Sequence, residues 1–250
     1  MKLLLMAGSG EARELAGTLA QIRGLETVAS LAGATRDPPA LAVATRSGGF
    51  GGGSAQAAWM RAQGFDAVLD ATHPFAARIK ARTARIADGL GLPCLHLIRP
   101  PWRPGPGDNW REIATPQAAT RHIRPGATVF LATGRATLAG FAGLRGCRVI
   151  SRQITAPEAP FPWPGGEYLP ARPPFSLADE LALFERLRPD WLVVKNAGGE
   201  APRAKLLAAR QLGIPVLLLA RPDPPAGSVV ATKSEALDWL DRLLKMGPAH

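Results

Sequence analysis

The sequence predicts an α/β protein with two Rossmann-like lobes, largely parallel sheets and a ligand cleft between the lobes. Three observations predict this class. Short apolar runs alternate with longer amphipathic stretches, which is typical of βαβ units and a parallel sheet. The alternation occurs twice, before and after a proline-rich segment. A chain of 250 residues is also long enough to bury one large core or two modest ones.

The first half of the chain has four apolar runs that predict strands, at residues 3–6, 27–31, 67–70 and 93–97. Residues 11–21 and 55–63 carry helical spacing. Residues 99–110 hold four prolines, which can continue neither a helix nor a central strand. We therefore expect residues 1–98 to form the first lobe, 99–112 a linker and 113–250 the second lobe.

The second half repeats the scheme. It predicts strands at residues 128–132, 147–151, 191–194 and 216–219, and helices at 177–188, 202–211 and 234–243. Residues 154–175 are too rich in proline for either element. Because a connection of this length in a compact domain is usually functional, it is predicted to be a mobile lid.

The formal net charge of +10 implies an acidic partner, such as nucleic acid, an anionic membrane or a polyanionic ligand. The cations are mostly arginines spread along the chain, which suit carboxylates and phosphates; a charge that serves only solubility is the alternative. Nucleic-acid binding would need basic clusters with interleaved aromatics, and there is one tyrosine. The apolar runs are too short for a membrane span or a signal peptide. We expect no nucleic-acid or membrane partner and a cytoplasmic location.

Two cysteines, both inside apolar runs, predict neither a disulfide framework nor a metal site. The first strand runs into Gly8, Ser9 and Gly10 and then a helix, which is an anion site if it is more than a plain βα turn. Arg13 stands where the dinucleotide fingerprint has its third glycine. The second strand ends without an acid, and Arg36 lies just beyond, which favours a 2′-phosphorylated cofactor.

A second glycine-rich segment begins at Arg46 and includes Gly49 and Phe50, with five glycines in the six positions 48–53. Glycines lose more conformational entropy on folding than other residues, so a close approach or a motion should justify them. A flexible surface loop is the alternative.

Polar residues also follow other predicted strands. Pro74 suits the first turn of a helix, which would place Thr72 or His73 at its cap. Because the carboxyl ends of parallel strands face the ligand site, these residues are candidates for it. A lone histidine is nevertheless often structural. A lysine at the carboxyl end of a strand could hold an anion or give a proton. The candidates are Asp70, Thr72 and His73 in the first half, and Thr133, Gly134, Arg135, Lys195, Asn196, Gly198 and Gly199 in the second.

Taken in order, the segments AGSGEAREL, RSGGFGG, DATHPFA, TGRATL and VVKNAGG resemble the precorrin-6A reductase family of cobalamin biosynthesis, from the first strand to about Pro222. Ala7, Ala12, Pro173 and Ala197 depart from the family's usual pattern. The resemblance implies that hydride from NADPH reduces one ring double bond of precorrin-6A, a polycarboxylate tetrapyrrole, to give precorrin-6B. It implies no metal or flavin.

The resemblance also implies roles for the candidate residues. Lys195, Asp70 and His73 would be catalytic. The cofactor would contact Gly8, Ser9, Gly10, Arg36, Thr133, Gly134 and Arg135. The substrate would contact Arg46, Gly49, Phe50, Thr72, Asn196, Gly198 and Gly199. The alternative is another enzyme with two Rossmann-like lobes, such as an S-adenosylmethionine-dependent tetrapyrrole methyltransferase.

Overall fold

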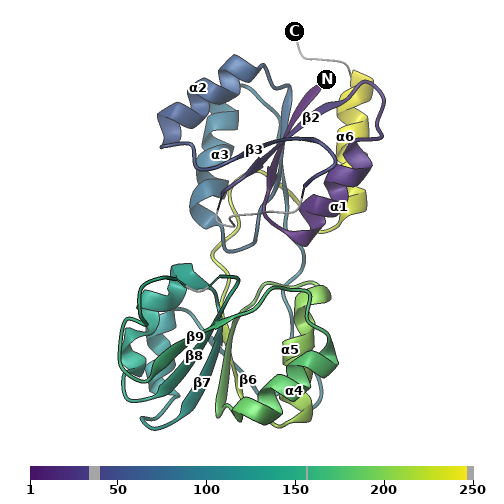
Figure 1. The fold of residues 1–250 in the computed structure, drawn as a ribbon. Helices are drawn as coiled ribbons and strands as arrows, with labels where there is room; N and C mark the ends of the chain where they lie inside the picture. Colours follow the sequence, from purple (N-terminus) through teal and green to yellow (C-terminus); the bar gives the residue numbers. More distant parts are fainter. Residues whose placement is uncertain (34–39, 156, 247–250) are drawn as a thin grey trace. The chain divides into compact units, whose positions relative to one another are not determined.

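The structure is a computed structural model that describes residues 1–33, 40–155 and 157–246. The chain divides into two compact units, each built on one six-stranded sheet (Figure 1). The first unit comprises Met1–Arg99 and Pro222–His250, and the second comprises Pro100–Arg221.

The first sheet has the strand order β12-β5-β4-β1-β2-β3, and all of its paired strands are parallel. Helices α1 and α6 cover one face and helices α2 and α3 cover the other (Figure 1). The strands are β1 (Lys2–Ala7), β2 (Glu26–Leu31), β3 (Ala44–Ser47), β4 (Ala67–Ala71), β5 (Cys94–Leu97) and β12 (Ser228–Val230); the helices are α1 (Gly10–Leu19), α2 (Gly53–Gln63), α3 (Ala77–Gly89) and α6 (Lys233–Met246).

Strand β1 shows why this sheet is buried on both faces. Leu3 and Leu5 belong to the core beneath α1 and α6, whereas Leu4 and Met6 belong to the core that includes Met60 of α2. Successive side chains of a strand point to opposite faces, so a continuous apolar run can cover both.

The second sheet has the order β6-β11-β10-β7-β8-β9 and is also parallel in every pair. Its strands are β6 (Trp110–Ile113), β7 (Thr128–Ala132), β8 (Arg148–Gln153), β9 (Gly166–Pro170), β10 (Trp191–Lys195) and β11 (Val216–Leu219). Its helices are α4 (Leu177–Leu187) and α5 (Ala204–Gln211), with 3-10 helices η1 (Pro116–Arg121), η2 (Arg135–Leu144) and η3 (Ala201–Arg203). Phe130 and Leu192 pack against Phe184 of α4 and Leu206 of α5.

Five strands of each sheet share one order, but the sixth differs: β12 is the last strand of its sheet along the chain, whereas β6 is the first of its own. Read from the opposite edges, the orders are β3-β2-β1-β4-β5-β12 and β9-β8-β7-β10-β11-β6. Within the five shared strands the order reverses once, between β1 and β4 in the first sheet and between β7 and β10 in the second. Open α/β sheets bind ligands beyond the carboxyl ends of the strands at this switch point. The fold therefore provides two places where ligand-binding residues should gather.

The eight predicted strands and five predicted helices are present, with ends shifted by a few residues. The predicted division of the chain differs from the structure at its C-terminal end, because residues 222–250 were expected in the second lobe. Instead β12 pairs with β5, and Ala236 and Leu240 of α6 enter the first core. Strand β6 also lies partly inside the predicted linker. Periodicity identifies an element but carries no information about the sheet that it joins.

Two local expectations were wrong. Residues 154–175 were predicted to contain no regular element, yet they include β9, and Trp163 is buried with its ring 4.7 Å from that of Phe161. Pro74 was predicted in the first helical turn, yet α3 begins at Ala77 with Ala76 at its N-cap. A lid function for residues 154–175 stays a prediction. In the described part of the chain, no helix has the length and apolar character needed to cross a membrane.

Candidate functional site

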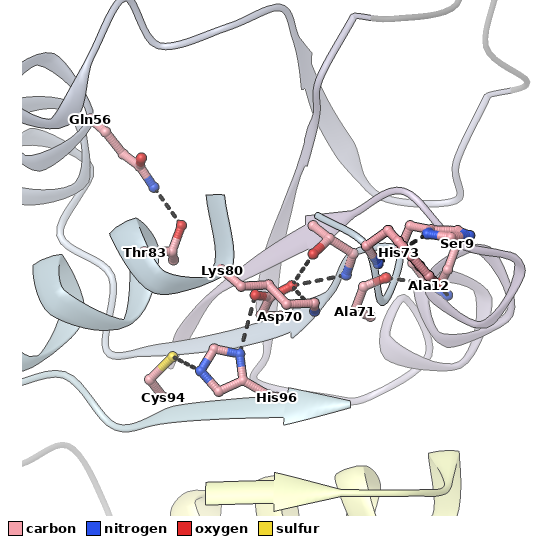
Figure 2. Close-up of polar contacts among 12 residues, drawn as sticks. Ser9, Ala12, Gln56, Asp70, Ala71, His73, Lys80, Thr83, Cys94 and His96 are labelled. Carbon is pink, nitrogen blue, oxygen red and sulfur yellow. Dashed lines mark hydrogen bonds and ion pairs between the residues drawn. The ribbon is translucent and has the colours of Figure 1, made fainter. Parts of the chain in front are cut away.

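The carboxyl ends of β1 and β4 bring the first group of predicted residues together. Ala7 of β1 is the cross-strand neighbour of Ala71 of β4, so the turns that follow both strands lie side by side. The Ser9 hydroxyl donates to the Ala71 carbonyl at 2.8 Å and accepts a hydrogen bond from the Ala12 amide at 3.1 Å (Figure 2). Ser9 therefore caps α1 and ties its N-terminus to β4.

A small pocket lies at this switch point. Its walls are Ser9, Glu11, Thr72, Pro74, Leu97 and Arg99. Nη1 of Arg99 lies 2.5 Å from Oε2 of Glu11. Burial alone would raise the pKa of Glu11, but hydrogen bonds from its own backbone amide and from Arg99, together with the Arg99 charge, lower it overall. The N-terminus of α1 thus lies beside an arginine–glutamate ion pair, and the helix N-terminus itself attracts anions.

Glu11 and Arg99 are not among the site residues predicted from the sequence. Arg99 lies at the start of the predicted linker, and Glu11 is an ordinary first-turn acid, so neither position carried a signal for this pocket.

Asp70 is the centre of a buried polar network beneath α3 (Figure 2). Its Oδ1 accepts hydrogen bonds from the Thr72 amide at 2.9 Å, the Thr72 hydroxyl at 2.7 Å and Nζ of Lys80 at 3.1 Å. Its Oδ2 lies 3.1 Å from Nδ1 of His96. The alternation of β4 and β5 turns Asp70 and His96 toward the same face, where Lys80 of α3 meets them.

Asp70 is ionised in this network. Burial would raise its pKa, but the hydrogen bond from His96, the Lys80 charge and the two Thr72 bonds lower the pKa to about 2. The side chain is fully buried and both oxygens are occupied. Asp70 therefore positions Thr72 through two hydrogen bonds, and its catalytic role stays a prediction. Lys80 and His96 were missed, because a lysine and a histidine within regular elements gave no motif.

His73 is half-buried in the turn after β4. Its Nδ1 accepts a hydrogen bond from the Phe75 amide at 3.2 Å, so a neutral ring carries its proton on Nε2. This bond orients the ring. The catalytic role of His73 stays a prediction.

Arg46 lies at the carboxyl end of β3. It donates from Nη1 to the Ser30 hydroxyl at 2.9 Å and from Nη2 to the Gly49 carbonyl at 3.2 Å. Its guanidinium carbon is 4.0 Å from the centre of the Phe50 ring. The structure thus joins Arg46, Gly49 and Phe50 in one cluster, while Arg36, the predicted cofactor residue nearby, lies outside the described residues.

The carboxyl ends of β7 and β10 gather the predicted residues of the second unit. Ala132 pairs with Val194, which places Thr133 beside Lys195. Thr133 is buried, whereas Arg135 donates from Nη2 to the Thr155 carbonyl at 3.3 Å. The element that follows this turn is the 3-10 helix η2, not an α-helix. Lys195 is half-buried, and burial lowers its pKa below the usual lysine value.

Asn196 and Gly199 hold the segment that enters the second unit. The Asn196 side chain accepts from the Trp102 amide at 2.8 Å and donates to the Trp102 carbonyl at 3.2 Å. The Gly199 carbonyl accepts from Nε1 of Trp102 at 2.8 Å. Arg221 donates from Nε to the Asn196 carbonyl at 2.6 Å. These bonds give Asn196 an anchoring role, and substrate binding by Asn196, Gly198 or Gly199 stays a prediction.

Gly198→Ala is expected to destabilise the protein. Gly198 has φ +67°, and an added Cβ would lie 2.0 Å from the Pro100 carbonyl oxygen. Gly213→Ala is the matched control, because Gly213 also has φ +67° but open space around it. We expect about 1–2 kcal/mol for the control, from backbone conformation alone, and a clearly larger loss for Gly198→Ala. Urea unfolding measures the loss in both variants. Equal losses would show that the backbone at Pro100 moves away from the added Cβ at no cost in free energy.

Two doubly wound parallel sheets, each with polar residues at its switch point, define an α/β protein of two Rossmann-like lobes. The family model described as "Precorrin-6x reductase CbiJ/CobK" matches residues 2–241, and the chain belongs to this family.

Individual relatives agree with the family match. The chain is 43% identical over 246 residues to a precorrin-6A reductase of Rhodococcus erythropolis, covering 98% of this chain and 99% of the relative. It is 38% identical over 240 residues to a precorrin-6A reductase of Rhodobacter capsulatus, covering 96% and 95%. A solved structure named CobK precorrin-6A reductase matches with a TM-score of 0.92 at 37% identity, covering 97% and 96%.

Proposed function

We propose that the protein is a precorrin-6A reductase of cobalamin biosynthesis that uses NADPH and acts in the cytoplasm. The observation that carries the proposal is the near full-length similarity to precorrin-6A reductases of two organisms. It favours a reductase over the methyltransferase that the sequence left open. The reaction adds a hydride to one carbon of a ring double bond of precorrin-6A and a proton to the neighbouring carbon, which gives precorrin-6B.

The turn between β1 and α1 fits a dinucleotide phosphate. A Cβ at Gly10 would meet no atom within 4 Å, and one at Gly8 would make only ordinary contacts, so the free chain has space for a ligand at both. The N-terminus of α1 offers backbone N–H groups and the positive end of the helix dipole. When bound, NADPH supplies the hydride, and the residues of this chain orient the reactants and stabilise charge.

The substrate carries several carboxylates, which the net charge of +10 complements. Thr72, held by Asp70, would bind at the reacting face. Lys195 would either hold a substrate carboxylate or supply the proton that completes the reduction. The lowered pKa of Lys195 brings it closer to the pH at which an ammonium group gives up a proton readily.

Incubation of the purified protein with precorrin-6A and NADPH tests the function. Absorbance should show consumption of NADPH, and mass spectrometry should show a product heavier by one hydride and one proton. NADPH deuterated at the transferred position should place one deuterium in the product. Failure to consume NADPH, or a product of unchanged mass, would contradict the proposal.

Cofactor preference is a separate expectation. Strand β2 ends at Leu31 without an acid to hold the ribose hydroxyls of NADH, so NADPH should bind at least tenfold more tightly, about 1.4 kcal/mol. Calorimetric titration of both nucleotides measures the ratio, and equal affinities would remove this expectation.

A further inference from the structure

The residue that follows β10, Asn196, is held at each of its polar atoms. Its amide donates to the Leu219 carbonyl at 3.0 Å, and its carbonyl accepts from Nε of Arg221 at 2.6 Å. Its side chain accepts from the Trp102 amide at 2.8 Å and donates to the Trp102 carbonyl at 3.2 Å. Asn196 is 4% exposed, so water does not compete for these bonds. The peptide groups on both sides of Asn196 are therefore fixed in orientation.

Arg221 joins this residue to both ends of the second unit. Pro100 and Arg221 are the first and last residues of that unit. Nη2 of Arg221 donates to the Pro100 carbonyl at 3.1 Å, while Nε donates to Asn196. Gly198 leaves the space for these bonds, because a Cβ there would lie 2.5 Å from Nη2 and 2.0 Å from the Pro100 oxygen. The closed set of contacts among Pro100, Trp102, Asn196 and Arg221 is here called the Arg221 clamp.

The Arg221 clamp lies directly after Lys195, the last residue of β10. The Lys195 carbonyl accepts from the Ala197 amide at 2.6 Å, so the backbone turns sharply after the lysine. The direction of a side chain depends on the backbone that carries it, and the clamp fixes that backbone. Resting on the proposed function, we propose that Arg221 is a positioning residue for the reduction: by holding the Asn196 carbonyl, it aims Lys195 at precorrin-6A.

The turn after β10 needs such support. It contains two glycines with positive φ, Gly198 at +67° and Gly199 at +81°, and glycine has more backbone freedom than any other residue. The lysine stem is itself flexible. Misplacement of a reacting group by about 1 Å can cost on the order of a hundredfold in rate. Hydrogen bonds that restrict this turn therefore bear directly on the reaction.

Arg221→Met tests the proposal, because methionine keeps an unbranched stem and removes both donors. Arg210→Met is the matched control. Arg210 is a half-buried arginine of the same unit that also donates from Nε and Nη2, but to Asp108, at 2.8 and 2.7 Å. Thermal melts check folding. Arg221→Lys, which keeps the charge without the fork, replaces the methionine variant if that variant does not fold.

Two measurements separate positioning from a merely structural role. Steady-state kinetics with precorrin-6A compares Arg221→Met, Lys195→Met and the variant that carries both changes, which forms a double-mutant cycle. Hydrogen exchange of the peptides that contain Asn196 and Trp102 follows the Arg221 clamp without any need for activity.

We expect Arg221→Met to lower kcat/KM by about tenfold or more, through whichever of kcat and KM is changed by Lys195→Met. In the Lys195→Met background the same substitution should cost about threefold or less, because no ammonium is left to aim. Exchange at Asn196 and Trp102 should become faster in Arg221→Met. Arg221→Lys should recover part of the lost activity, and Arg210→Met should match the unmodified protein in kinetics and in exchange at these two residues.

Three results would overturn the proposal: losses that multiply in the double variant, a loss confined to the other kinetic parameter, or unchanged hydrogen exchange. Multiplied losses with a raised KM would mean that Arg221 binds a substrate carboxylate itself. Failure of the proposed function is distinguishable, because it would appear in the unmodified protein as a lack of precorrin-6A reduction. Failure of the positioning role leaves that reduction intact.

Discussion

Lys195→Met is expected to lower kcat/KM for precorrin-6A by on the order of a hundredfold, which is within the range for a positioned proton donor. Lys195 ends β10 beside the turn that follows β7, at the switch point of the second sheet. Methionine keeps the aliphatic stem of the half-buried side chain. Steady-state kinetics distinguishes its two possible roles: loss of a proton donor lowers kcat with little change in KM, whereas loss of carboxylate binding raises KM.

Lys245→Met is the control, because Lys245 is an exposed residue of α6 paired with Asp241 and should leave the kinetics unchanged. NADPH affinity should change less than kcat/KM in Lys195→Met, since the proposed phosphate site is the turn between β1 and α1. If the Lys195 variant folds normally and keeps more than about a third of its activity, Lys195 does not act on the substrate.

The strands that the sequence predicted and those it missed differ in their place in the sheet. The eight predicted strands are the interior ones, such as β1 and β10, whose apolar side chains are buried on both faces. The four missed strands, β3, β6, β9 and β12, are the four edge strands. Edge strands are short and partly exposed, so they lack a continuous apolar run. Helix α3 was not given bounds because two of its three buried residues, Lys80 and Thr83, are polar.

The location of the candidate site was predictable, because polar residues after parallel strands must gather at one edge of the sheet. The roles of single residues were not. Two partners of Asp70, Lys80 and His96, lie 10 and 26 residues away on other elements, and Asn196 binds Trp102, which is 94 residues distant. Such contacts depend on tertiary packing and leave no local pattern, so an anchoring residue and a substrate ligand look alike in the sequence.

Asp70→Asn is expected to lower the free energy of unfolding by about 3–5 kcal/mol, because it leaves the Lys80 ammonium buried without its counter-charge. Lys80 is 2% exposed, so water cannot replace the lost carboxylate. Chemical denaturation measures the change. Glu26→Gln is the control: the Lys2–Glu26 pair has the same 3.1 Å separation but an exposed glutamate, so its loss should cost at most about 1 kcal/mol.

The double variant Asp70→Asn with Lys80→Met should recover part of this loss, because it removes the uncompensated charge as well as its partner. An Asp70→Asn variant as stable as the unmodified protein would show that Lys80 is not held as a cation by Asp70.

The pH dependence gives an independent measure of the same network. The pKa of Asp70 is lowered from 3.8 to about 2 in the folded protein, so as pH falls the unfolded chain takes up the proton first. The stabilisation is therefore fully present above about pH 4 and is lost as pH falls through about 2, and its size is about 2 kcal/mol. Asparagine cannot titrate, so the stability difference between the unmodified protein and Asp70→Asn should shrink over this interval. A difference that stays constant from pH 5 to the lowest pH at which both proteins fold would mean that Asp70 is not ionised in the network, and that Thr72 is positioned by a neutral acid.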